Sequence, residues 1–167
     1  MIRCENALDT SAIYDVHTQA FERENEAQLV DKIRDSDCYI PQLSLVAEVD
    51  NTVVGHILFS CIELVGKENL RVLGLAPLAV VPKFQRQGIG SALVQVGLET
   101  AETMGEALVV VLGHPQFYAR FGFQPSLNYG IKSPFPVPAD AFMVKLLTSY
   151  QEKYQGTVVY PPAFQEV

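Results

Sequence analysis

The segment from Leu73 to Leu93 reads LGLAPLAVVPKFQRQGIGSAL. Its apolar run ends at Val81 before Pro82, a short polar stretch with two glycines follows, and a helical pattern begins at Ser91. A strand, a glycine-rich turn and a helix in this order leave the backbone N–H groups of the first helical turn free at the positive end of the helix. Because such a turn binds phosphate or pyrophosphate, the segment predicts an anion site.

Two common nucleotide motifs do not fit this turn. A P-loop is excluded because no Gly-Lys-Ser/Thr follows the glycines. A Rossmann fingerprint needs three glycines and an acidic residue on a second strand, whereas this turn has only Gly88 and Gly90, and strand-like hairpins precede it. The sequence therefore indicates a pyrophosphate site of another kind.

The order Gln85-x-x-Gly88-x-Gly90 resembles the acyl-CoA-binding motif of the GNAT superfamily of N-acetyltransferases. Residues 78–82 (LAVVP) resemble the strand that grips the pantetheine arm in that family, and residues 117–123 (FYARFGF) resemble its later FY-x-x-x-GF segment. The closing residues 159–164 and the Gly-His-Pro at 113–115 resemble one bacterial, uncharacterised branch. The resemblance implies direct transfer of an acetyl group from acetyl-CoA (coenzyme A) to a primary amine of a small molecule or protein.

The resemblance also implies a set of cofactor-binding residues, namely Leu78, Ala79, Val80, Gln85, Arg86, Gln87, Gly88, Ile89, Gly90 and Ser91. The physical properties of the turn agree with it. Glycine has no Cβ, so the backbone can approach phosphate oxygens closely and adopt positive φ. Lys83 and Arg86 place positive charge beside the turn in an otherwise acidic chain, which suits a multiply charged cofactor.

Pro77 interrupts the apolar run. Proline cannot donate to a sheet ladder, so this strand is expected either to be bulged or to lie at a sheet edge. The resemblance implies that the strand splays from the buried strand at residues 107–112 and leaves a cleft for the thioester. Leu78 and Val80 then offer backbone groups to the pantetheine amides, and an N–H near Leu78 faces the developing oxyanion.

Acetyl transfer needs an acid for the departing thiolate and a neutral amine. By resemblance Tyr118 is the acid, since the matching family tyrosine lies near the CoA sulfur. The general base stays open, because residues 73–81 contain no carboxylate. Glu63, His114, His56 and a water chain are the alternatives, and each of the three side chains also has a purely structural interpretation. Cys61 has no basic neighbour in the local sequence to lower its pKa, which argues against an acyl-cysteine.

The composition of the chain limits its domain number, its partners and its cellular compartment. With 167 residues, 49% of them hydrophobic, the chain is expected to form one domain over residues 1–167. A net charge of −7 argues against nucleic acid or an anionic membrane as partner. No spanning segment or signal peptide is evident, so a cytoplasmic enzyme is expected. Three scattered cysteines favour neither a metal site nor a disulfide set, and buried free thiols are expected.

Periodicity and turn signals predict an α/β (α+β) fold with a mixed, mostly antiparallel sheet flanked by helices. A first helix is expected to run through Phe21, with its N-cap among Asp9, Thr10 and Ser11. Further helices are expected over 25–34, 88–104 and 116–121. Strands are expected over 1–6, 44–48, 52–62, 73–81, 107–112, 123–125 and, as the last one, 141–147, with a tight hairpin at 50–51 and a loop over 126–140.

The sequence says least about the amine that accepts the acetyl group. In this fold the first two helices and their loop contact it, and here they carry His17, Glu22, Glu24 and Glu26. Acidic residues suit a cationic amine, but a solvated charged face is the explanation that the sequence favours. The proline-rich loop at 126–138 is expected to wall the acceptor side or to form a homodimer contact. A non-catalytic acyl-CoA-binding regulatory or interaction module is the alternative function, because the expected strand carboxylate is missing.

Overall fold

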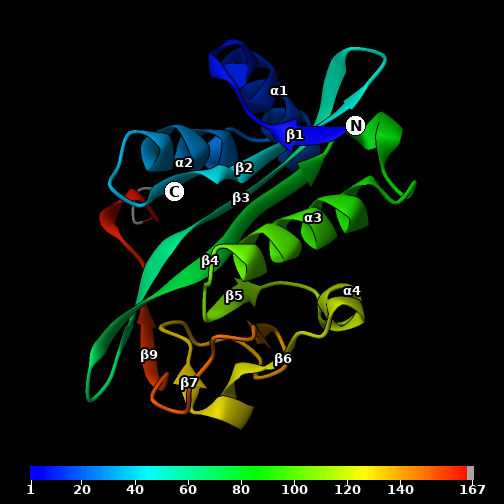
Figure 1. Cartoon of the computed structure of the whole chain (residues 1–167). Coiled ribbons are helices and arrows are strands. Elements are labelled where there is room, and N and C mark those ends of the chain that lie inside the picture. The colour runs from blue at the N-terminus through cyan, green and yellow to red at the C-terminus, as the bar shows by residue number, and fades with distance from the viewer. Residues whose placement is uncertain (165–167) are drawn as a thin grey trace.

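The computed structural model describes residues 1–164 (Figure 1). Its strands are β1 (Ile2–Cys4), β2 (Tyr39–Val49), β3 (Thr52–Val65), β4 (Asn69–Val80), β5 (Leu108–Leu112), β6 (Gln124–Pro125), β7 (Ile131–Lys132), β8 (Phe142–Leu146) and β9 (Gly156–Val159). Its α-helices are α1 (Thr10–Phe21), α2 (Asn25–Arg34), α3 (Ile89–Thr103) and α4 (Pro115–Tyr118). Short 3-10 turns include η2 (Pro82–Phe84), η3 (Ala119–Phe121), η4 (Ser126–Tyr129) and η5 (Pro162–Phe164).

Within the described residues the strands form one mixed sheet. Its order is β1-β2-β3-β4-β5-β8-β6, and β9 pairs with both β3 and β7. Most neighbours are antiparallel, whereas β4 with β5 and β7 with β9 are parallel. The predicted mixed, mostly antiparallel sheet is therefore confirmed.

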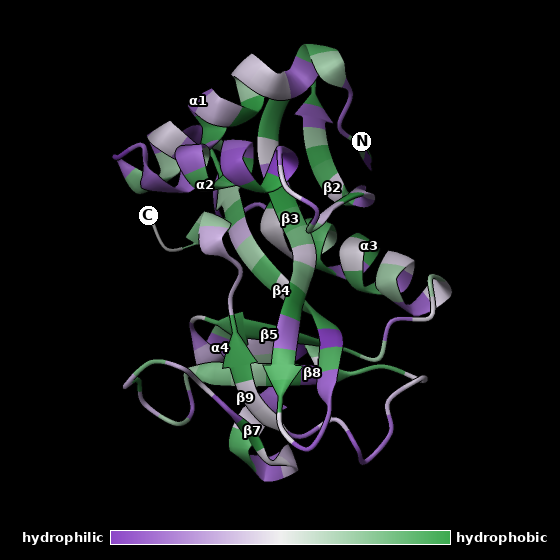
Figure 2. Ribbon diagram, turned by 90° about the vertical axis from the view of Figure 1, so that its left-hand side faces the viewer, coloured by the Kyte–Doolittle hydropathy of each residue, from purple (hydrophilic) through white to green (hydrophobic). Residues whose placement is uncertain are grey.

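Helices cover the two faces of the sheet. Figure 2 shows α1 and α2 on one side of β3 and β4, and α3 on the other. Side chains alternate along a strand, so Phe59 packs on the α3 side among Leu93 and Val94. Leu58 points the other way, to Ile13 of α1 and residues of α2. We call these the α3 face and the α1 face of the sheet.

The predicted helices and turns agree with the structure. The helix over 25–34 has the expected bounds, and α3 ends before Gly105, whose φ of +80° stops the helix. Asp50 and Asn51 both have positive φ, at 50° and 63°, as a two-residue hairpin of the primed type requires.

Three expectations about the chain were wrong. The strand over 142–146 is not the last, because β9 follows it, and the expected loop over 126–140 contains η4 and β7. Short strands with a glycine or proline beside them have too little alternation to stand out. The expected buried thiols are instead exposed at Cys4 and half-buried at Cys38 and Cys61, although all three are free.

β4 carries the feature that shapes the site. It pairs with β3 on both sides of Pro77, but the register shifts where Leu58 of β3 faces Ala76 and Pro77, which are joined by a cis peptide bond. Pro77 therefore lies in a bulge and not at a sheet edge. The parallel pairing of β4 with β5 covers only Leu73 and Gly74. Beyond Gly74 the two strands separate, as the resemblance implied.

Between residues 1 and 164, none of the helices combines the length and apolar character needed to cross a membrane.

Candidate functional site

A pocket of about 490 Å³ opens where β4 ends and α3 begins. Its walls come from the end of β4, the turn that follows, the first residues of α3 and the α4–η3 segment. The lining residues are Val80, Phe84, Gln85, Arg86, Gly88, Gly90, Ser91, Phe117 and Arg120. The turn singled out in the sequence therefore forms the floor of a cavity large enough for part of an extended ligand.

The first turn of α3 presents free amides to this pocket. The first turn-closing bond runs from the Ala92 amide to the Gly88 carbonyl, so the amides of Ile89, Gly90 and Ser91 precede it. Gly88 has φ +85°, a left-handed conformation that glycine adopts without strain. Together with the positive end of the helix dipole, these amides form a site for an anion.

Gly90 lines the pocket from the first turn of α3. A Cβ at this position would lie 3.9 Å from Phe117 Cζ and 3.9 Å from Val80 Cγ2, both of which belong to pocket-lining residues. A methyl group therefore fits among its neighbours, whereas a longer side chain would extend into the space that the pocket leaves open.

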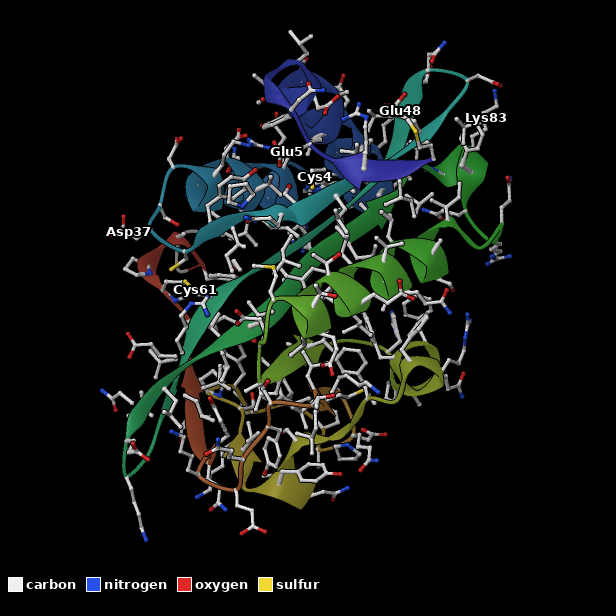
Figure 3. The ribbon with its side chains drawn as sticks, in the orientation of Figure 1. Cys4, Glu5, Asp37, Glu48, Cys61 and Lys83 are labelled. Atoms are coloured by element: carbon white, nitrogen blue, oxygen red, sulfur yellow. The ribbon has the colours of Figure 1, made fainter. Side chains whose placement is uncertain are left out.

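Side-chain amides hold the turn in shape. Gln85 Nε2 donates to the Val80 carbonyl over 2.8 Å, which ties the turn back to the end of β4. Gln87 Nε2 donates to the Lys83 carbonyl over 3.4 Å. Lys83 itself projects from η2 at the rim of the molecule (Figure 3), where its ammonium lies 5.9 Å from the centre of the Phe84 ring. These contacts occupy the glutamine side chains and leave the anion to the backbone.

Two guanidinium groups flank the pocket. Arg120 Nη2 donates to Ser91 Oγ over 2.7 Å, and its guanidinium lies 5.4 Å from the ring centres of both Phe117 and Phe121. Arg86 lines the same pocket from the turn and is exposed. Guanidinium groups match phosphate oxygens in charge and geometry. The pocket can therefore hold a phosphorylated ligand between the two arginines.

The structure brings together some of the predicted cofactor residues and separates others. Val80, Gln85, Arg86, Gly88, Gly90 and Ser91 line the pocket. Leu78 packs toward the core on the α3 face, and Ala79 packs under α1 on the opposite face. Ile89 is half-buried against both clusters, and the Gln87 side chain bonds the backbone. For these four, a role in binding would have to come from the backbone.

Tyr118 lies next to the pocket in α4. Its ring contacts Phe117 and Phe123 edge-on, with centroids 4.9 Å and 5.5 Å away. Burial raises the pKa of Tyr118 to about 12, so its hydroxyl stays protonated at neutral pH. A buried, protonated phenol is a proton donor that does not ionise under working conditions.

The candidate bases lie in three different places. Glu63 faces Arg71 across β3 and β4 and lines a separate pocket of about 440 Å³ together with Cys61 and Tyr160. His114 caps the N-terminus of α4 with an exposed side chain. His56 is fully buried on the α1 face. None of the three lines the pocket at the start of α3.

Three lining residues were absent from the predicted set: Phe84, Phe117 and Arg120. Phe117 and Arg120 belong to the second motif, so the signal was in the sequence. Their direction was not, because it depends on how α4 and η3 turn back against α3.

Comparison with known proteins gives relatives over nearly the whole chain. A sequence profile of the acetyltransferase (GNAT) domain matches residues 41–125. The uncharacterised N-acetyltransferase YjhQ of Escherichia coli K12 is 38% identical over 155 residues, which cover 90% of this chain and 86% of the relative. The uncharacterised N-acetyltransferase YhbS of the same strain is 37% identical over 148 residues, covering 88% and 87%.

Two solved structures are similar in both sequence and shape. The crystal structure of the GNAT family N-acetyltransferase YhbS from Escherichia coli in complex with CoA has a TM-score of 0.89 at 34% identity, over 98% of this chain and 91% of that one. A GNAT family acetyltransferase from Brucella melitensis in complex with acetyl-CoA has a TM-score of 0.81 at 32% identity, covering 99% and 97%.

Proposed function

Since this chain belongs to the GNAT family of acetyltransferases, we propose that it moves an acetyl group directly from acetyl-CoA to a primary amine of a small molecule or protein. Acetyl-CoA is the cosubstrate, consistent with the two relatives whose structures contain CoA and acetyl-CoA. One domain over residues 1–167 carries the reaction. The observation that supports this most directly is the pocket at the start of α3, where free helical amides meet two arginines.

The pyrophosphate is proposed to lie on the amides of Ile89, Gly90 and Ser91, with Arg86 and Arg120 beside its phosphate oxygens. From there the pantetheine arm runs into the space between β4 and β5, which separate beyond Gly74. Residues 78–80 of β4 pair with β3 but not with β5, and their remaining backbone groups are proposed to bond the pantetheine amides.

In the reaction the amine nitrogen forms a bond to the acyl carbon and the carbon–sulfur bond breaks. The nitrogen loses one proton, and the thiolate sulfur takes one. Tyr118 is proposed as the donor to sulfur, because it belongs to the second motif, lies in α4 beside the pocket and carries its proton at neutral pH. Solvent returns the proton to Tyr118 and accepts the one lost by the amine. A backbone N–H near Leu78 is proposed to stabilise the oxyanion.

Two measurements test the proposal in sequence. Calorimetry with acetyl-CoA comes first, and no binding at tens of micromolar would end it. A panel of primary amines with acetyl-CoA and a free-thiol readout follows. Release of CoA above the hydrolysis background for at least one amine supports the enzyme.

One observation favours a second function. β4 contains no carboxylate, so a general base in the usual sense is absent from the strand beside the cleft. A non-catalytic acyl-CoA-binding module would bind acetyl-CoA normally but leave every amine at the hydrolysis background. The same pair of measurements therefore separates the two functions.

A further inference from the structure

A row of hydrogen-bonded polar side chains crosses the α1 face of the sheet. It starts at the ion pair of Arg34 with Glu5, 3.0 Å long, and Glu5 then contacts the hydroxyl of Ser44. Ser44 Oγ lies 2.8 Å from His56 Nε2, and His56 Nδ1 lies 2.8 Å from His17 Nε2. We call Glu5, Ser44, His56 and His17 the polar relay. Figure 3 shows Glu5 between β2 and the helices α1 and α2.

Protonation along the polar relay is fixed from one end. Burial alone would raise the pKa of Glu5, but hydrogen bonds from His56, Ser44 and Arg34 outweigh it and lower this pKa to about 2. The carboxylate is therefore ionised and can only accept. The hydroxyl of Ser44 therefore donates its hydrogen bond to Glu5. Ser44 Oγ in turn accepts a hydrogen bond from His56, so His56 carries its proton on Nε2.

The tautomer of His56 fixes that of His17. Burial lowers the pKa of His56 despite the hydrogen bond to Glu5 that raises it, so the ring is neutral and its Nδ1 is bare. His17 must then donate from Nε2. Burial, followed by the charges of His56 and Arg34, lowers the pKa of His17 to about 2. His17 Nδ1 is consequently a bare lone pair.

This lone pair has no partner among residues 1–164. His17 is 0% exposed, and its Nδ1 is one of two buried side-chain atoms in that range without a hydrogen bond. The other is Ser60 Oγ. Buried polar atoms are nearly always paired, so an orphan at the end of an otherwise complete row points to a missing partner.

Ser60 and His56, the residue that holds His17, pair with the two ends of the stretch of β4 that separates from β5. Ser60 faces Gly74, the last residue of β4 that pairs with β5, and His56 faces Ala79 beyond the bulge. The polar relay runs from the β1–β2 side across β3 and stops in α1, which contacts both β3 and β4. His17 is thus the last member of the relay and lies on the helix that packs on both β3 and β4.

The surroundings provide an approach for a ligand. The ring of Phe21 stacks on His17 with centroids 6.2 Å apart and is itself 37% exposed. Because His17 is 0% exposed, an approach by a ligand requires that the Phe21 side chain turn away from the imidazole.

We propose that His17 Nδ1 accepts a hydrogen bond from the amine that receives the acetyl group, and that the polar relay exists to present this lone pair. The inference rests on the proposed function. A neutral primary amine carries two N–H bonds and one lone pair, so one N–H directed at Nδ1 leaves the lone pair free for the thioester. His17 positions the amine and does not take its proton, which leaves to solvent.

Two variants separate the two ring nitrogens. In His17→Gln the side-chain amide reaches the place of Nε2, keeps the bond to His56 and removes the acceptor at the place of Nδ1. In His17→Asn the amide oxygen replaces Nδ1, and the bond to His56 is lost. With ethylamine, spermidine and Nα-acetyl-lysine amide as probes, His17→Gln is expected to lower kcat/KM about tenfold through KM, the effect of one lost hydrogen bond. His17→Asn should recover most of that loss.

Calorimetry of the variants and an experiment on the wild type distinguish a failure of this inference from a failure of the proposed function. Each variant should bind acetyl-CoA as the wild type does. Equal kinetics in wild type and His17→Gln overturn the inference and leave the proposed function standing. Wild-type protein that releases no CoA above background with any amine of the panel contradicts the proposed function. In either case, ¹⁵N NMR of histidine-labelled wild type with CoA and ethylamine decides His17. A bare Nδ1 that shifts on amine binding supports the inference; a protonated Nδ1, or a resonance unmoved by amine, overturns it.

Discussion

The guanidinium of Arg120 donates a hydrogen bond of 2.7 Å to the hydroxyl of Ser91, which joins η3 to the first turn of α3. Two segments that are 29 residues apart in the chain thereby share one pocket wall. Only one nitrogen of the Arg120 guanidinium, Nη2, donates to Ser91. The other N–H groups of the guanidinium can therefore donate to a phosphate oxygen. This contact and the pocket around it lead to the first prediction.

Arg120→Gln is expected to weaken CoA binding about tenfold, since a hydrogen bond between charged groups contributes on the order of 1.5–3 kcal/mol and this one is exposed. Calorimetry measures the change with CoA and with 3′-dephospho-CoA, and an equal loss for both assigns Arg120 to the pyrophosphate. Lys153→Gln removes the same charge far from the pocket, beside Tyr154. Equal affinity in wild type and Arg120→Gln would contradict the assignment.

The effect of replacing Gly90 on CoA binding should depend on the size of the new side chain. Gly90→Ala fits, because its Cβ would keep 3.9 Å from both neighbours, and it should change the affinity for CoA less than threefold. Gly90→Leu fills the pocket and should weaken binding at least tenfold while the melting temperature stays near the wild-type value. Calorimetry and thermal unfolding measure the two effects. Strong CoA binding by Gly90→Leu would place the cofactor elsewhere.

Tyr118→Phe is expected to lower kcat at least tenfold and to leave the dissociation constant of CoA unchanged, because a phenol that donates in the transition state adds nothing to ground-state binding. Steady-state transfer with a free-thiol readout measures it. Tyr160→Phe is the matched control: burial also raises the pKa of Tyr160 to about 12, but its ring packs on Phe135 and Phe164. Unchanged kcat in Tyr118→Phe would remove this tyrosine from the reaction.

Stability should fall in mild acid because of the two buried histidines. Burial lowers the pKa of both His17 and His56, so they stay neutral in the folded state while unfolded chains take up protons below pH 6.5. Their contribution is complete above pH 6.5 and is lost as pH falls below it, by about 1.4 kcal/mol per pH unit for each histidine that stays neutral. Glu5 adds a second loss between pH 4.5 and about 2.

Urea unfolding between pH 7.5 and pH 5 measures this dependence. His17→Gln should reduce the slope by about half, since one of the two neutral imidazoles is gone. His114→Gln is the control, because that histidine is exposed, and it should leave the slope as in the wild type. A free energy of unfolding that is flat from pH 6.5 to pH 5 would contradict the neutral state of the buried pair.

Much of the architecture was predictable from the sequence. The helix at 25–34, the hairpin at Asp50 and Asn51 and the stop at Gly105 depend on neighbours in the chain. The separation of β4 from β5 followed from one residue, Pro77, together with the family resemblance. Strands β7 and β9 are only two and four residues long. They form because β9 pairs with β3, which lies far away in the sequence.

The site was predictable in part for the same reason. Residues 85–91 lie in one turn, so their spacing in the sequence was enough to predict the anion site. Arg120 reaches that site only because α4 and η3 fold back on α3. The polar relay joins residues 5, 17, 44 and 56, brought together by the sheet register and by α1. No local pattern links these positions, so only the folded chain reveals their order.

The early end of the pairing between β4 and β5 also bears on aggregation. An unpaired strand edge is the place where other chains add on and aggregates start. Here β4 from Leu75 onward and the end of β5 lack each other's hydrogen bonds, yet these edges face one another inside the sheet and not at its rim. These inner edges are therefore less open to strand addition by a second chain than the outer edge of a sheet would be. The gap proposed to admit the pantetheine arm therefore leaves two strand edges unpaired without placing them at the rim of the sheet.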